Sequence, residues 1–186
     1  HRGEVMKIGI IGAMNEEVVE LKAVMSDIKS ENIGNLEFFK GKLLGKDVVL
    51  VEGGIGKVNA AICATLMINH FKVDKVLFTG VAGGVNPDIN IGDIVIGKDL
   101  IEHDFDSTAF GYELGQIPRM DTYIFKADQE LIDIACDVAE KEFGKSKVCL
   151  GRIVSGDEFV ASLERIEWLR NTFNADCTEM EGAAVA

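Results

Sequence analysis

Apolar runs that end in glycine constrain most strongly what this chain can fold into. Three short, nearly continuous apolar segments occupy residues 6–12, 47–52 and 75–79, and each stops at one or more glycines. Such runs are typical of strands buried on both faces of a sheet. Glycine at their ends allows the sharp turns that bring the backbone close to a ligand. The pattern predicts an open sheet whose strand ends border a binding crevice.

Helical patterns alternate with these strands. After the first run, Val18, Leu21, Met25 and Ile28 fall on one apolar stripe and predict a helix. The other elements that the sequence predicts are strands at 36–44, 91–96, 148–154 and 176–180, a hairpin turn at Gly45-Lys46, and helices at about 57–71, 127–143 and 163–173, with Asp128 capping the helix at 127–143. This order predicts an α/β fold of three layers, α/β/α, with a central mixed, largely parallel sheet flanked by helices.

The length of the chain and its two ends define the expected domain. At 186 residues with 47% hydrophobic content, the chain predicts one packed domain over residues 6–186. Residues 1–5, which precede Met6, are typical of expression-vector sequence. Residues 181–186 resemble the first turn of a helix, and no capping glycine or polar tail follows them. We therefore expect a C-terminal truncation that removes one strand and one helix.

Charge and cysteine content exclude several classes of function. The formal net charge of −12 disfavours binding to nucleic acid or to anionic membranes. The four cysteines are widely spaced, which predicts reduced thiols in a cytoplasmic protein. Because the chain has three histidines and no C-x-x-C pair, we expect no metal site, and no segment predicts a cofactor.

Two glycine-rich segments resemble nucleotide-binding motifs but lack residues that those motifs require. Residues 53–58 lack the hydroxyl residue after the lysine of a phosphate-binding loop, because Val58 stands there. Residues 9–12 do not continue into a dinucleotide fingerprint, because Ala13 and Asn15 occupy the wrong places. The glycines in both segments are better explained as turns between strand and helix.

Two groups of carboxylates follow predicted strands. Glu16 and Glu17 come just after the first strand, and Glu179 and Glu181 flank Met180 at the end of the last one. A single acidic residue at a helix start is an ordinary partner of the helix dipole. Their combination with five ordered segments points to chemistry instead. These segments are 9–17 (GIIGAMNEE), 54–58 (GIGKV), 79–84 (TGVAGG), 155–159 (SGDEF) and 179–181 (EME).

The five segments closely resemble the 5′-methylthioadenosine/S-adenosylhomocysteine nucleosidases, which are members of the nucleoside phosphorylase superfamily. The resemblance extends over residues 6–186. It implies a nucleoside phosphorylase-like fold and hydrolysis of the N-glycosidic bond of 5′-methylthioadenosine, S-adenosylhomocysteine and related 5′-deoxyadenosines. This reaction releases adenine and belongs to methionine salvage.

The resemblance also assigns roles to individual residues. Glu17 corresponds to the general base that activates water, and Glu181 to the carboxylate that binds the ribose hydroxyls. The resemblance places Glu179 and Met180 in the substrate site, Met180 under the sugar. The remaining implied contacts are base stacking by Phe159, purine-edge contacts by Val160, main-chain lining by Ala82 and Gly83, and proximity of Ile55 to the 5′ substituent.

A homodimer is implied as well, because Phe110 and Pro118 correspond to residues that enter the partner's site. The family's general-acid aspartate lies downstream of the 179–181 segment, beyond the printed sequence, and Asp176 cannot replace it because it lies upstream. We therefore expect a polypeptide limited to these residues to be nearly inactive. Val81 stands where many relatives carry a serine, and it is either a tolerated variant or a change that affects catalysis.

Two alternatives remain open at this point. A phosphorylase of the same superfamily attacks with phosphate, which favours arginines or a helix N-terminus free of negative charge. The segment Asn15-Glu16-Glu17 would repel such a dianion, which favours water. A non-catalytic nucleoside-binding protein would keep the fold and bind without turnover.

Overall fold

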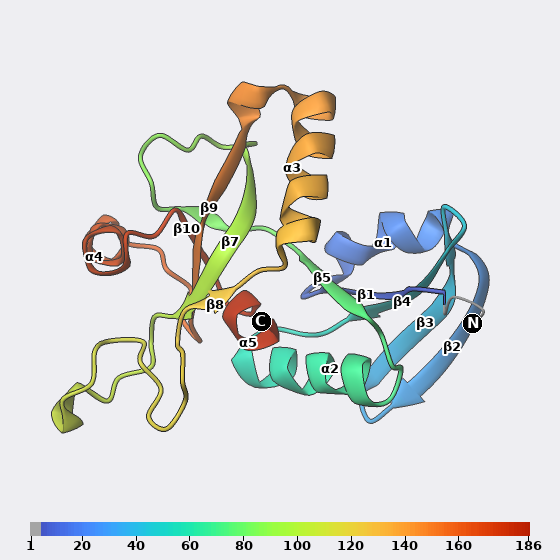
Figure 1. Ribbon diagram of the computed structural model, residues 1–186, viewed down its shortest axis with the longest axis horizontal. Coiled ribbons are helices and arrows are strands. Elements are labelled where there is room, and N and C mark those ends of the chain that lie inside the picture. The colour runs from blue at the N-terminus through green and yellow to red at the C-terminus, as the bar shows by residue number, and fades with distance from the viewer. Residues whose placement is uncertain (1–4) are drawn as a thin grey trace. The chain divides into compact units, whose positions relative to one another are not determined.

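The computed structural model describes residues 5–186, and their backbone divides into two compact units (Figure 1). The first unit ends at Val81 and the second begins at Ala82. The single domain expected from the sequence stays a prediction. Within the described residues, no helix is both long enough and apolar enough to cross a bilayer.

The first unit is a five-stranded mixed sheet between two helices. Its strands follow the order β2-β3-β4-β1-β5, with β1 parallel to both β4 and β5 and the β2-β3-β4 ladders antiparallel. The elements are β1 (Lys7–Gly12), α1 (Asn15–Val24), β2 (Ser26–Ile33), β3 (Leu36–Leu43), β4 (Lys46–Glu52), α2 (Lys57–Asn69) and β5 (Lys75–Thr79).

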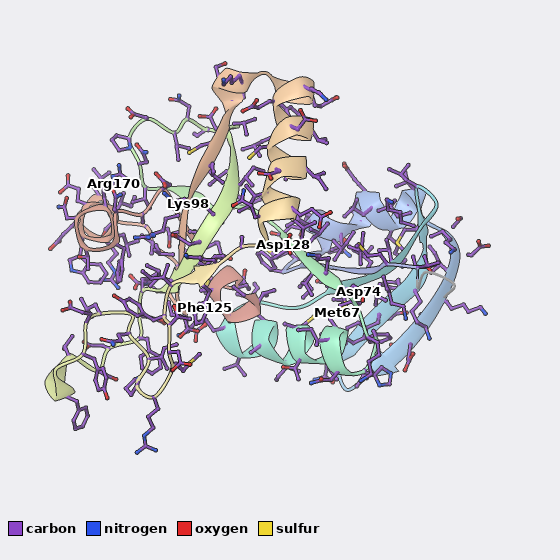
Figure 2. All side chains as sticks on the ribbon, viewed as in Figure 1. Met67, Asp74, Lys98, Phe125, Asp128 and Arg170 are labelled. Carbon is purple, nitrogen blue, oxygen red and sulfur yellow. The ribbon has the colours of Figure 1, made fainter. Side chains whose placement is uncertain are left out.

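Alternating side chains of β4 explain why helices cover both faces of this sheet. Val48 and Leu50 pack in one apolar cluster with Val18 of α1. Val49 and Val51 point the other way, into a cluster that contains Met67 of α2 (Figure 2). The two helices therefore lie on opposite faces of the sheet (Figure 1), as the continuous apolar run of β4 predicts.

The second unit is also a five-stranded mixed sheet with helices on both sides (Figure 1). Its strands follow the order β6-β10-β9-β7-β8, with β9 parallel to β7 and β10 and the edge strands β6 and β8 antiparallel. The elements are β6 (Gly83–Gly84), β7 (Ile94–Glu102), a 3₁₀ helix (Thr108–Phe110), β8 (Phe125–Lys126), α3 (Gln129–Phe143), a 3₁₀ helix (Lys145–Lys147), β9 (Val148–Ser155), α4 (Leu163–Phe173), β10 (Cys177–Glu179) and α5 (Gly182–Val185).

The predicted fold class is confirmed, since mixed, largely parallel sheets are flanked by helices. The strands pair as two sheets, one in each unit, where the sequence suggested one central sheet. Strand β5 and helix α4 have the bounds that the sequence predicts. Asp128 is the N-cap of α3 (Figure 2), and its carboxylate accepts a hydrogen bond of 3.0 Å from the Leu131 N–H.

Three local predictions were wrong. Helix α1 ends at Val24, so Met25 and Ile28 do not extend its stripe, and Ile28 lies in the edge strand β2. The hairpin turn consists of Leu44 and Gly45 and not of Gly45 and Lys46. Leu44 and Gly45 have positive φ, 49° and 78°, as the two central residues of such a turn require. Strand β7 begins at Ile94 and not at residue 91, because Gly92, with φ of 90°, turns the chain first.

Candidate active site

Three parallel strands of the first unit end side by side. Gly12, the last residue of β1, is in register with Glu52 of β4 and with Thr79 of β5. The segments that leave these strands therefore start at one edge of the sheet. They carry Glu17, Ile55 and the Gly80–Val81 pair, so the structure brings these predicted residues to a common edge of the first unit.

Glu17 is half-buried in the first turn of α1 and is held by two backbone donors. Its Oε2 accepts a hydrogen bond of 2.9 Å from the Met14 N–H, and its Oε1 accepts one of 3.3 Å from the Val81 N–H. Glycines leave room for this carboxylate. A Cβ at Gly80 would lie 3.0 Å from Oε1, and one at Gly12 would lie 3.0 Å from the Glu17 Cβ. Val81 thus contacts the predicted base through its backbone, and its side chain is exposed.

Ile55 is half-exposed in the turn that joins β4 to α2. Gly54 and Gly56 on either side of it have φ of 79° and 92°, values that favour glycine. The Ile55 carbonyl accepts a hydrogen bond of 2.7 Å from Asn59 Nδ2, which ties the turn to the helix. These glycines therefore turn the chain from strand to helix, as the sequence indicated.

A corresponding edge exists in the second unit. Ser155, the last residue of β9, is in register with Glu102 of β7 and with Glu179 of β10. The Gly156–Val160 loop follows β9, and Met180 and Glu181 follow β10. The structure therefore gathers the predicted base-binding and sugar-binding residues of this unit at one edge.

Glu179 is engaged by neighbouring groups at this edge. Its Oε1 accepts a hydrogen bond from the Ser155 hydroxyl, and its Oε2 accepts hydrogen bonds from the backbone N–H groups of Glu181 and Gly182, at 3.0 and 2.7 Å. The Ser155 Oγ in turn accepts a hydrogen bond of 2.8 Å from the Ala183 N–H. Ser155 has no role among the residues singled out from the sequence, although its place at the end of a strand in the Ser-Gly-Asp segment was a usable signal.

Glu181 is buried, with 7% of its surface exposed, and immediately precedes α5. Its carbonyl accepts a hydrogen bond of 2.9 Å from the Ala184 N–H. Met180 beside it is half-buried. Burial of a carboxylate is costly unless polar groups surround it, so its position marks a place where hydrogen-bonding partners are required.

The Gly156–Val160 loop is anchored while its aromatic residue is exposed. The Asp157 N–H donates a hydrogen bond of 2.8 Å to Asp104 Oδ2, and Val160 packs against the core of the second unit. A Cβ at Gly156 would lie 2.5 Å from the His103 ring, so no larger residue fits there without rearrangement. Phe159 lies between these anchors with 83% of its surface exposed, which suits a ring that stacks on a ligand.

Three of the other four predicted residues of the second unit are exposed. Ala82 and Gly83 lie at the surface, and Gly83 pairs with Thr178 in the sheet. Phe110 ends the first 3₁₀ helix with 85% of its surface exposed, and Pro118 is half-buried. Their roles toward a ligand or a partner stay predictions.

Asp176 has a structural part in the second unit. Its Oδ2 accepts a hydrogen bond of 2.8 Å from the Arg152 N–H, and its Oδ1 accepts one of 3.0 Å from Asn86 Nδ2 and one of 3.4 Å from Arg170 Nη1. Asp176 immediately precedes β10, and these contacts tie it to β9, to α4 and to the segment after β6, so both of its carboxylate oxygens are engaged within the fold.

The described residues include possible metal ligands and buried cysteine thiols. No group of three or more His, Cys, Asp or Glu side chains among residues 5–186 has an arrangement that could hold a metal ion. Burial raises the pKa of the Cys63 and Cys177 thiols to about 12, so neither is a thiolate near neutral pH.

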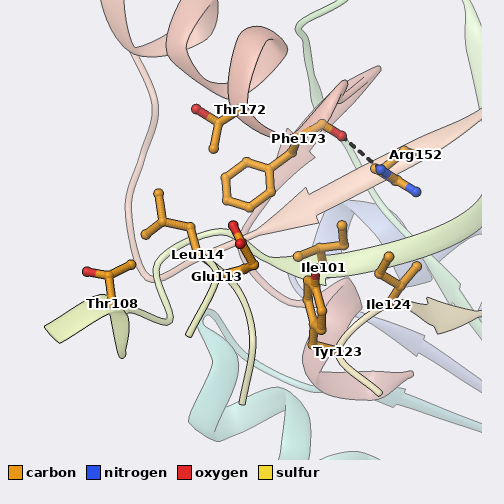
Figure 3. Close-up of a pocket in the computed structure, with 9 residues that line it drawn as sticks. All are labelled: Ile101, Thr108, Glu113, Leu114, Tyr123, Ile124, Arg152, Thr172 and Phe173. Carbon is orange, nitrogen blue, oxygen red and sulfur yellow. Dashed lines mark hydrogen bonds between the residues drawn. The ribbon is translucent and has the colours of Figure 1, made fainter. Parts of the chain in front are cut away.

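A hollow of about 290 Å³ lies in the second unit, and its lining residues are not among those that the sequence singled out (Figure 3). In it, Arg152 Nη1 donates a hydrogen bond of 2.9 Å to the Phe173 carbonyl, and the same guanidinium forms a two-point ion pair with Asp99 at 2.7 and 2.9 Å. The hydrogen bonds with Asp99 raise the Arg152 pKa, and the positive charge of Arg152 is neutralised within the protein by this ion pair. The lining residues are Ile101, Thr108, Glu113, Leu114, Tyr123, Ile124, Arg152, Thr172 and Phe173.

Comparison with known proteins shows the family to which the chain belongs. Residues 7–186 match the family model described as the phosphorylase superfamily. The 5′-methylthioadenosine/S-adenosylhomocysteine nucleosidase of Staphylococcus carnosus is 46% identical over 180 residues, which are 96% of this chain and 78% of that protein.

Solved structures of the same enzyme have the same fold. The Neisseria meningitidis nucleosidase in complex with methylthio-immucillin-A is 40% identical, with a TM-score of 0.92 over 98% of this chain and 78% of that one. The Colwellia psychrerythraea nucleosidase in complex with adenine is 41% identical, with a TM-score of 0.92 over 98% of this chain and 75% of that one. The chain therefore belongs to the 5′-methylthioadenosine/S-adenosylhomocysteine nucleosidases of the phosphorylase superfamily.

Proposed function

We propose that this protein hydrolyses the N-glycosidic bond of 5′-methylthioadenosine and S-adenosylhomocysteine and releases adenine. The observation that carries the proposal is that each unit of this chain, which belongs to the nucleosidase family, has a carboxylate shortly after the end of a strand. Glu17 follows β1 in the first unit, and Glu181 follows β10 in the second.

The two carboxylates have different tasks in such a reaction. Breaking the bond between base and sugar builds positive charge on the ribose, and a fixed carboxylate stabilises that charge. Glu181 supplies this charge and accepts hydrogen bonds from the ribose hydroxyls. Glu17 orients the attacking water and takes its proton, because two backbone donors fix its carboxylate while the residue stays half-exposed.

Water is the favoured nucleophile over phosphate. A phosphate dianion binds where arginines or uncompensated helix N-termini surround it. The first turn of α1 instead carries Glu16 and Glu17. Their charges repel a dianion and leave a neutral nucleophile unaffected.

The purine is bound by the loop that follows β9. Phe159 stacks on the ring, and Val160 offers its backbone to the purine edge. Adenine leaves most easily when an acid protonates its ring. The family resemblance implies an aspartate downstream of Glu181 for this step, and Asp176 does not take its place because both of its carboxylate oxygens are engaged within the fold.

The deciding experiment is an adenine-release assay of the complete gene product with 5′-methylthioadenosine, with and without added phosphate. We expect adenine and a free 5-methylthioribose in both conditions. Formation of the sugar 1-phosphate when phosphate is added would support a phosphorylase. Binding of nucleoside without release of adenine would support a non-catalytic binding protein.

We also propose that the protein is a cytoplasmic homodimer in which Phe110 and Pro118 reach the partner's site. The exposed ring of Phe110 and the four free cysteines support this assignment. A mixture of Glu17→Gln and Phe110→Ala subunits tests it, because a heterodimer would rebuild one intact site. Recovery of activity on mixing is expected, and activity no higher than the sum of the two variants would contradict the shared site.

A further inference from the structure

The carboxylate of Glu179 lies at the centre of a hydrogen-bonded network behind Glu181. It accepts the Ser155 hydroxyl on one oxygen and the N–H groups of Glu181 and Gly182 on the other. An ionised carboxylate offers about four acceptor positions. At least three of them are occupied by groups of the protein itself, which leaves little capacity for a sugar hydroxyl.

Ser155 is fixed in both of its hydrogen-bonding directions. Its hydroxyl donates to Glu179, and the same oxygen accepts the Ala183 N–H at 2.8 Å. The side chain is fully buried at the end of β9. A hydroxyl that both donates and accepts in a buried place joins its two partners rigidly, since breaking either bond leaves a buried polar group unsatisfied.

Together these contacts determine the backbone that carries Glu181. The N–H groups of Glu181, Gly182 and Ala183 all donate to Glu179 or Ser155. Glu181 is the N-cap of α5, and Gly182 and Ala183 are its first two residues. Glu181 is buried, so the place of its carboxylate depends on the backbone that these hydrogen bonds hold.

We propose that Ser155 and Glu179 are positioning residues that hold Glu181 in the orientation needed to bind the ribose hydroxyls. The proposal rests on the proposed function, because it gives Glu181 the ribose as its ligand. Glu179 then acts by holding Glu181 in place and does not itself contact the substrate.

The experiment compares two ligands by calorimetry. One is adenine, which lacks the ribose. The other is a C-nucleoside analogue of adenosine, in which a carbon–carbon bond replaces the glycosidic bond and prevents hydrolysis. The variants are Ser155→Ala, Glu179→Gln and, as a matched control, Thr178→Val, which removes a buried hydroxyl from the adjacent strand β10. The Thr178 hydroxyl donates to the Val154 carbonyl at 3.0 Å and not to Glu179.

We expect Ser155→Ala and Glu179→Gln each to weaken the C-nucleoside about tenfold, the loss of about one hydrogen bond to a charged group. Adenine affinity should change less than about twofold in both, and Thr178→Val should leave both affinities near those of the unchanged protein. In a Glu181→Gln background, Ser155→Ala should have no further effect on the C-nucleoside, because the two residues act through one contact.

Equal weakening of both ligands, or an undiminished effect in the Glu181→Gln background, would overturn the positioning role. Should Ser155→Ala fail to fold, the Glu179→Gln variant tests the proposal through the same quantity, the affinity for the C-nucleoside relative to the affinity for adenine. Failure of the unchanged protein to bind either ligand would refute the proposal together with the proposed function. Binding without adenine release would refute hydrolysis alone, because the ratio of affinities does not depend on turnover.

Discussion

The edges of the two sheets present their carboxylates in opposite ways. In the first unit, Glu17 is half-exposed and is held directly by the N–H groups of Met14 and Val81. In the second unit, Glu181 is buried, and a second carboxylate, Glu179, organises the backbone beneath it. A group that exchanges protons with water needs access to solvent, whereas a group that supplies a fixed charge to a sugar needs rigidity. The difference teaches that the two carboxylates need different kinds of support.

The largest effect should come from Glu17→Gln. The amide keeps an oxygen that can accept the Met14 N–H but cannot take a proton from water. We expect kcat of the complete gene product to fall about 10³-fold, within the range usual for a general base. Affinity for the C-nucleoside should change only a few-fold. The control is Glu16→Gln, an exposed neighbour in the same turn, and a comparable loss of kcat there would remove the distinction between the two.

Glu181→Gln should weaken binding of the nucleoside more than it lowers kcat, because the proposed role of this carboxylate is to bind the ribose. We expect the C-nucleoside to bind about tenfold to a hundredfold more weakly, as when a hydrogen bond to a charged group is lost. Adenine should bind as before. Calorimetry with both ligands checks this result. An unchanged preference for the nucleoside over adenine would mean that Glu181 does not contact the sugar.

Phe159→Ala tests binding of the base independently of binding of the sugar. Stacking of a base on an aromatic ring contributes about 1–3 kcal/mol, so adenine and the C-nucleoside should both weaken about tenfold. The melting temperature should hardly change, because 83% of the Phe159 surface is exposed. Leu163→Ala, at a residue that is 79% exposed, is the matched control. If the two variants behaved alike, Phe159 would have no role in binding.

The sequence predicted well those elements whose pattern is local. Strand β5 and helix α4 carry their own hydrophobic periodicity, and Asp128 caps α3 through a contact three residues away. Strand β2 was missed because its sequence, SDIKSENI, is polar and forms an exposed edge, and pairing with β3 determines it. Strand β6 consists of two glycines, which carry no side-chain pattern at all.

The same limit applies to the candidate site. The positions of Glu17 and Glu181 after strands were visible in the sequence, whereas Phe159 was singled out only through the family resemblance. The contact between Ser155 and Glu179 joins residues 24 positions apart across two parallel strands. This contact depends on the register between β9 and β10, so no periodicity in the sequence predicts it.

The smallest expected effect concerns the alkylation rates of two buried thiols, Cys63 in the first unit and Cys177 in the second. Cys63 is packed beneath Gly53 in the first unit, where a Cβ on that glycine would lie 3.3 Å from Sγ, and Cys177 begins β10 in the second. Burial raises the pKa of both to about 12. At pH 9 only about one thiol in a thousand would be ionised, and alkylation requires the thiolate. Both should react with iodoacetamide far more slowly than Cys136, which is partly exposed.

Alkylation, followed by peptide mass spectrometry, also reports how firmly each edge is held. The rates at Cys63 and Cys177 should rise with pH, because burial keeps the folded thiols protonated near neutral pH. If the Ser155–Glu179 pair makes the second edge rigid, Ser155→Ala should accelerate labelling at Cys177 severalfold and leave Cys63 unchanged. Equal acceleration at both thiols would show that the substitution loosens the whole protein, and the proposed contrast between the two edges would then be wrong.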